Sequence, residues 1–232
     1  QCWEGKFCVA KLVPVTGGYS IDATEVTRDQ YGAWLAGSPT PSGQDPWCSW
    51  NTAFSPFCEW PAGSKGDYAV VCVDWCDAYA YCKGVGKRMC GKIGGGANGY
   101  SPEYANDASK SQWYNACSSG GVNQYPYGDS YVGSSCNGGG FEDPHVGTMA
   151  VGSMTGCQSS VSGYEGVYDL SGNVYEWEDS CSGNTGPTDR CRLRGGSNMS
   201  PSDSLDCGDP DVTYHTRDNV VYDSFGFRCC AP

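Results

Sequence analysis

The chain has 232 residues, a formal net charge of -12, and 16 cysteines and 34 glycines. A chain of this length can bury about 70% of its extended surface, so we expect one globular domain over residues 1–232 and no long disordered region. The acidic balance excludes nucleic acid as a partner, because binding a phosphate backbone requires clustered Lys and Arg.

The cysteines indicate where the protein works. Their even number and their spacing, which matches no zinc motif, make disulfides the plain interpretation. Disulfides persist outside the reducing cytosol, so we expect a secreted or cell-surface, extracellular protein with nearly all cysteines bonded. A redox enzyme with reactive thiols is the alternative, which the acidic chain disfavours because such thiols need electropositive surroundings.

The chain shows no run of about 18 apolar residues, so we expect no transmembrane segment. It begins with Gln1 rather than Met, which we interpret as the mature form left after removal of a signal segment.

The first elements in the chain are a strand and a helix. Residues 19–26 are typical of a strand, and Thr27 is placed to cap a helix over 28–36. Residues 37–65, rich in Pro, Gly and Ser, follow as a long loop. Two cysteines in this loop are expected to pin it by disulfide bonding: Cys48 and Cys58.

Aromatic residues crowd the same loop. They could stack on a sugar, pack against a partner or fill a small core under the loop. We favour the core, because exposed aromatic clusters of this size are uncommon in monomers. The residues are Trp47, Trp50, Phe54, Phe57 and Trp60.

Two more helices are expected before the pattern becomes irregular. Asp74 is a suitable N-cap for a helix over 75–83, and residues 109–117 suggest a third, short helix. The glycines at 94–96 form a turn, since the full phosphate-loop pattern is missing. Beyond Cys117, short β-type runs alternate with glycine turns, and such loops need anchors such as disulfides or bound calcium. The fold class is therefore α+β, loop-rich and low in regular secondary structure.

Five stretches carry a family resemblance through their order and spacing. They are IDATEVT at 21–27, VDWCDAYAYC at 73–82 with GKR at 86–88, YPYG at 125–128, VYDLSGNVYEW at 167–177, and RGGS at 194–197 with FGFRC at 225–229. From about residue 19 to its end the chain resembles the formylglycine-generating-enzyme family, also called the sulfatase-modifying-factor family. The resemblance implies a fold related to that of C-type lectins, stabilised by disulfides and calcium.

The fourth stretch suggests a cation site. Asp169 and Glu176 are carboxylates seven residues apart around a Gly-Asn bend, where backbone carbonyls can turn inward, and Ca²⁺ prefers such oxygen ligands. The resemblance implies a structural calcium ion held by both side chains and by the carbonyls of Gly172 and Val174. The alternative is a turn that carries two solvated acids.

The resemblance also implies a second calcium site. It would use Asn137 and the carbonyl of Gly138, completed here by Glu142 or Asp143, because the loop that follows departs from the family pattern.

Two disulfides follow from the resemblance by position. They join Cys82 to Cys229 and Cys117 to Cys207. The other twelve cysteines have no positional guide, and their connectivity stays open.

The catalytic residues of the family are missing. Its copper-dependent members carry Gly-Gly-Ser-x-x-Cys-x-x-x-x-Cys, whose two thiolates bind Cu(I). Here the glycines and serine at 195–197 are followed by Ser200 and Leu205 at the two cysteine positions, and Cys207 lies two residues further on. The iron-dependent members of the family use three histidines, whereas this chain has two, His145 and His215.

We therefore interpret the chain as a secreted, non-catalytic binding or structural module, with an extracellular protein, a glycan or further copies of itself as the partner. The alternative is a divergent metal-dependent oxidoreductase that uses Cys, His or Met at new positions. Stoichiometric copper or iron in the purified protein would favour the enzyme, and calcium alone the module.

Overall fold

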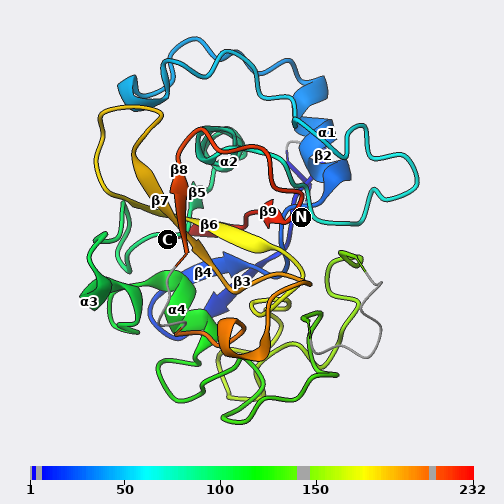
Figure 1. Cartoon of the computed structure of the whole chain (residues 1–232), viewed down its shortest axis with the longest axis vertical. Helices are drawn as coiled ribbons and strands as arrows, with labels where there is room; N and C mark the ends of the chain where they lie inside the picture. The colour runs from blue at the N-terminus through cyan, green and yellow to red at the C-terminus, as the bar shows by residue number, and fades with distance from the viewer. Residues whose placement is uncertain (1, 4–6, 140–146, 209–212) are drawn as a thin grey trace.

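The computed structural model describes residues 2–3, 7–139, 147–208 and 213–232, and its regular elements are short and joined by long loops (Figure 1). The helices are α1 (Arg28–Ala36), η1 (Pro46–Cys48), α2 (Trp75–Gly84), α3 (Pro102–Ala105), α4 (Gln112–Cys117) and η2 (Ser202–Ser204). The strands are β1 (Cys2–Trp3), β2 (Phe7–Cys8), β3 (Leu12–Val15), β4 (Tyr19–Asp22), β5 (Arg88–Met89), β6 (Tyr175–Cys181), β7 (Arg190–Arg194), β8 (Tyr214–Thr216), β9 (Phe225–Gly226) and β10 (Cys229–Ala231). Within these ranges no helix is long and apolar enough to cross a bilayer.

Two four-stranded sheets organise the molecule. Their strand orders are β3-β4-β10-β5 and β8-β7-β6-β9, and β1 and β2 form a separate pair. Strand β10 lies antiparallel between β4 and β5, with Cys230 opposite Ile21 on one side and Arg88 on the other. In the second sheet β9 runs parallel to β6, while β7 pairs antiparallel with it. The last segment of the chain therefore contributes to both sheets, and β10 joins β4 to β5 inside the first.

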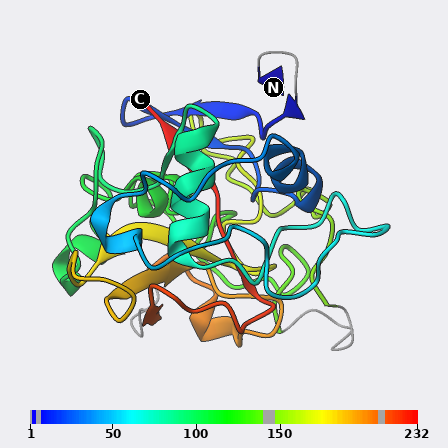
Figure 2. The same cartoon turned by 90° about the horizontal axis from the view of Figure 1, so that it is seen from above.

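Helices α1 and α2 pack together with the second sheet. Their buried faces join residues such as Trp177 and Leu193 in one apolar cluster, to which Phe227 also belongs. Residues 37–65 run over α2 on the side that faces the viewer in Figure 2. A second cluster lies between β3, β4 and α4 and includes Trp113 and Leu170. Aromatic side chains such as Tyr31, Trp75 and Trp177 fill much of the first cluster, whereas the second contains fewer of them.

Local capping chemistry determines where the main helices begin. Thr27 accepts a hydrogen bond from the backbone of Gln30, and the Gln30 side chain accepts one from the backbone of Thr27. Asp74 and Asp77 form the same reciprocal arrangement at the start of α2. Such a capping box satisfies donors that the first turn leaves free. The helix predicted over 28–36 is confirmed, and the one predicted over 75–83 extends one residue further.

The structure corrects three other expectations. The strand expected over 19–26 ends at residue 22, because the chain then leaves the sheet and Val26 pairs instead with Phe227 and Val70. The helix expected over 109–117 begins at residue 112, because the Ser111 side chain caps it. The β-type runs expected beyond Cys117 begin only with β6 at residue 175, because residues 118–139 and 147–174 form turns and isolated bridges.

Disulfides anchor the loops that lack regular structure. Cys48 and Cys58 each bond outside the loop at 37–65, to Cys76 and Cys72 respectively. The loop aromatics mostly pack on the core as expected: Phe54 is 5% exposed, and Trp47, Trp50 and Trp60 are partly buried against the first cluster. Phe57 is the exception at 69% exposure.

Candidate functional site

The segment after β7 occupies the place where the resemblance implies catalytic cysteines. Gly195 and Gly196 adopt φ of 85° and 71°, a region that favours glycine, and turn the chain back on itself. The hydroxyl of Ser200 then accepts a hydrogen bond from the Ser197 backbone at 2.9 Å and donates one to the Tyr175 hydroxyl at 3.0 Å. At the first cysteine position the chain therefore has a hydroxyl committed to holding this turn.

The second cysteine position is part of the apolar interior. Leu205 is 1% exposed and contacts the backbone at Gly138 and Gly196. Cys207 is bonded to Cys117, and the nearby thioether of Met199 is 78% exposed. A hydroxyl and a buried leucine supply no thiolate, so a Cu(I) site of the family type cannot form from these two residues.

Glu176 is held by a buried cation. Its two carboxylate oxygens accept hydrogen bonds from Nε and Nη2 of Arg228, both at 2.7 Å. One of them also accepts from the Trp113 indole at 2.9 Å. Burial disfavours the charged guanidinium, but the carboxylates of Glu176, Glu25 and Asp169 together outweigh this and raise the pKa of Arg228. The pair has the bidentate geometry of a strong ion pair.

Two further buried carboxyl groups interact electrostatically with the same guanidinium. Asp169 is buried and accepts a hydrogen bond from the Gly152 backbone at 2.6 Å. Glu25 is 0% exposed; its Oε1 accepts from Asn173 at 2.8 Å, and its Oε2 has no hydrogen-bond partner. Burial and the Asp169 charge raise the pKa of Glu25 well above its ordinary value. These groups form a buried acidic cluster around one arginine.

The calcium ligands implied by the resemblance can now be tested against this geometry. Calcium needs carboxylate oxygens that are free to coordinate it, whereas Arg228 and Trp113 already occupy Glu176. Over the described part of the chain, no group of three or more His, Cys, Asp or Glu side chains is arranged to hold a metal ion. The set formed by Asp169, Gly172, Val174 and Glu176 therefore does not fit a calcium site in this arrangement.

The second implied site lies against the first. The backbone carbonyl of Asn137 accepts a hydrogen bond from the Asn173 backbone at 2.7 Å. The side-chain amide of Asn137 donates to the Gly147 carbonyl and to Oδ1 of Asn173, both at 3.1 Å. Gly172 has a φ of 75°, and a Cβ there would clash with the Asn137 carbonyl. Asn137 and Gly138 thus fasten one loop to the Gly-Asn turn, while Glu142 and Asp143 lie outside the described residues.

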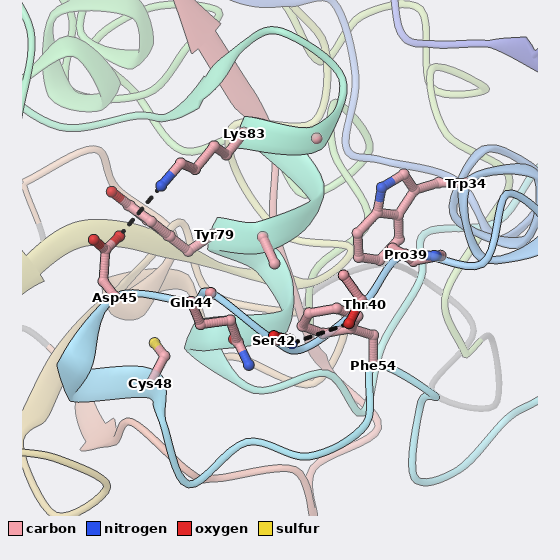
Figure 3. A pocket seen from close by; sticks show the side chains of 13 residues that line it. Trp34, Pro39, Thr40, Ser42, Gln44, Asp45, Cys48, Phe54, Tyr79 and Lys83 are labelled. Atoms are coloured by element: carbon pink, nitrogen blue, oxygen red, sulfur yellow. Dashed lines mark hydrogen bonds and ion pairs between the residues drawn. The ribbon is translucent and has the colours of Figure 1, made fainter.

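A hollow of about 220 Å³ lies between α1, α2 and the loop at 37–65. Trp34 and Phe54, whose rings are 5.2 Å apart, line one end, and the pair Asp45 and Lys83 lies at the other, 3.6 Å apart (Figure 3). Burial and the Asp45 charge raise the pKa of Tyr79, which also lines the hollow, to about 12. An aromatic wall with a polar rim is the usual form of a site for a small ligand.

Residues 10–231 match the family model described as a sulfatase-modifying factor enzyme 1-like domain. The chain belongs to this family. No match was found among curated proteins.

Several solved structures share this fold. The sulfatase-modifying-factor domain is 23% identical to CarF, with a TM-score of 0.61 over 92% of this chain and 86% of that one. PvdO from Pseudomonas aeruginosa is 20% identical, with a TM-score of 0.60 over 92% of this chain and 80% of that one. Treponema denticola variable protein 1 is 18% identical, with a TM-score of 0.56 over 92% of this chain and 84% of that one. At these identities the likeness establishes the fold alone.

The sulfatase-modifying-factor domain contains both disulfides that the resemblance implies, Cys82 to Cys229 and Cys117 to Cys207. The further pairs include Cys90 to Cys230, Cys136 to Cys157 and Cys181 to Cys191. No cysteine is free among the described residues.

Sequence reasoning missed the roles of Glu25 and Arg228. Each belongs to a stretch that carries the resemblance, but only the fold brings them together, since they are about two hundred positions apart in the chain. A charged residue inside an apolar stretch such as Phe-Gly-Phe-Arg was the available signal, because buried charges are paired.

Proposed function

We propose that this sulfatase-modifying-factor domain is a secreted, non-catalytic binding module whose ligand occupies the hollow beside Tyr79. The observation that carries the proposal is the replacement of the family thiolates by Ser200 and Leu205. The hydroxyl of Ser200 is engaged with Tyr175, and Leu205 is packed in the interior. Both groups serve the fold, and neither is available for thiol chemistry.

The extracellular setting is supported by the disulfides. Seven are formed between described cysteines, and such bonds persist in oxidising compartments. A module built this way keeps its loops in place without a large sheet, and a rigid loop surface loses little conformational entropy when a ligand binds.

Oxygen uptake with cysteine-containing peptides tests the non-catalytic assignment. We expect no turnover, with or without added copper, because breaking the Cys117–Cys207 disulfide to recruit a thiolate would cost about 2 to 5 kcal/mol. Turnover that is lost in Cys207→Ser but kept in Cys136→Ser, which breaks a different disulfide, would contradict the proposal.

Metal analysis of protein purified without chelator tests the alternative. A divergent metal-dependent oxidoreductase would contain stoichiometric copper or iron, whereas we expect neither in the binding module. The same measurement determines how much calcium the protein binds, and calcium alone would favour the binding module.

A further inference from the structure

A second hollow, of about 290 Å³, lies beside the first and shares Tyr79 with it. Its other walls include Trp47 and Trp75 together with the charged side chains of Asp179 and Arg217. Each hollow alone falls below the range of about 300–1,000 Å³ typical of ligand sites, and only the two together reach it. A ligand that uses this surface would therefore pass over Tyr79 and enter both.

The aromatic wall is held in place before any ligand arrives. The Tyr79 ring stacks on Trp75, with centroids 4.9 Å apart and planes inclined by 17°. The Trp75 indole donates to the Glu178 carbonyl at 3.0 Å, which fixes its rotation. The disulfide from Cys48 to Cys76 ties the segment that carries Trp47 to α2. A fixed aromatic surface packs well against the C–H faces of a flat, rigid ligand.

The charges around the two hollows oppose any ligand that carries net charge. Asp45 and Lys83 lie in the first, and Asp179 and Arg217 in the second. An anion would meet a carboxylate in each hollow, and a cation would meet an ammonium or guanidinium group. A neutral ligand whose hydroxyls both donate and accept hydrogen bonds can satisfy both kinds of group.

Unused hydrogen-bonding capacity remains around both hollows. The Asp179 carboxylate accepts no hydrogen bond from the described residues, although it faces Arg217 across the cavity wall. The side-chain amide oxygen of Gln44, beside the first hollow, and the indole N–H of Trp47, beside the second, are buried without partners. Native proteins leave few such groups unpaired, and of the three the Asp179 carboxylate is the one for which ligand hydroxyls or water are the expected partners.

We infer that the two hollows form one binding surface for a neutral oligosaccharide, whose sugar rings pack on the aromatic wall at Tyr79 while their hydroxyls bridge the paired charges on either side. This inference rests on the proposed function, because it names the class of ligand that the binding module takes.

A microarray of neutral mono- to tetrasaccharides, followed by calorimetric titration of the tightest binder, tests the inference. We expect Tyr79→Ala to weaken binding at least tenfold and Asp179→Asn to weaken it several-fold. Phe57→Ala removes an exposed aromatic side chain of the loop at 37–65 that lines neither hollow. The affinity of this variant should equal that of the parent. Cooperative thermal unfolding close to that of the parent would show that the variants are folded, and Tyr79→Phe, which keeps the ring, should retain most of the affinity.

The outcomes separate this inference from the proposed function. Equal binding by Tyr79→Ala and the parent would overturn the site, and a preference for sulfated or amino sugars would overturn the assignment of a neutral ligand. Binding of an extracellular peptide, lost in Tyr79→Ala while no glycan binds, would overturn the inference and leave the binding module standing. Turnover of cysteine peptides without glycan binding would overturn both.

Discussion

Replacing Glu176 by Gln distinguishes a buried ion pair from a metal ligand. In the parent, Arg228 and Trp113 make three hydrogen bonds to the carboxylate. Glutamine keeps the shape but turns an amide donor toward the guanidinium. Removing one partner of a buried pair costs about 3 to 5 kcal/mol. We expect the lower end of that range, because Glu25 and Asp169 also face Arg228 and offset part of its charge.

Thermal unfolding with excess calcium and with chelator is the assay. A loss of about 3 kcal/mol corresponds to a fall of roughly 6 to 12 °C in a domain of this size, and we expect the same fall in both buffers. Glu103→Gln, an exposed position, should melt like the parent.

The calcium interpretation makes the opposite prediction. If Glu176 held calcium, chelator would lower the melting temperature of the parent to that of Glu176→Gln, by about 3 kcal/mol when free calcium had been at a hundredfold excess over its Kd. If Glu176→Gln melted below the parent in calcium but at the same temperature as the parent in chelator, the ion-pair reasoning would be refuted.

Two further predictions concern the cysteines and Asp179. Thiol titration of the denatured, unreduced protein should find almost no reactive thiol, and more than about two per chain would contradict the extracellular assignment. Burial and the neighbouring Glu178 raise the pKa of Asp179 to about 7 from its ordinary 3.8, although Arg217 and Arg88 lower it. The folded state therefore holds this proton more tightly than the unfolded chain, so the stability it contributes is full below about pH 4 and is lost as the pH rises through 7. The melting temperature of the parent should fall relative to Asp179→Asn over that interval, and parallel profiles would rule this out.

Local chemistry made some elements predictable from the sequence alone. The start of α1 depends on Thr27 and the start of α2 on Asp74, and each cap forms with a residue three positions away. The strand expected over 19–26 is longer than the observed strand, which ends at residue 22. The alternation of side chains does not indicate where the chain must leave the sheet. That exit places Glu25 in the interior, where Asn173 and Arg228, both distant in the chain, interact with it.

Contacts between distant segments were out of reach unless the family supplied them. The pairing of Cys82 with Cys229 came from the resemblance, whereas Cys90 with Cys230, at a separation of 140 residues, had no guide. The ion pair of Glu176 with Arg228 was also missed, because two carboxylates at a glycine bend suggest a cation without saying which one. The geometry assigns that position to a side chain of the protein itself.

The two regions that bear on function are built from different parts of the chain. Ser200 and Leu205 belong to the connection between β7 and β8, which Cys207 ties to α4. The hollows belong to α1, α2 and the loop at 37–65, with the end of β6, and share no lining residue with that connection. The aromatic surface therefore does not depend on the residues at the two cysteine positions, since its rigidity comes from Cys48–Cys76 and from stacking on Trp75. Substitutions at Ser200 or Leu205 should therefore leave the proposed binding surface unchanged, because the two regions depend on different residues.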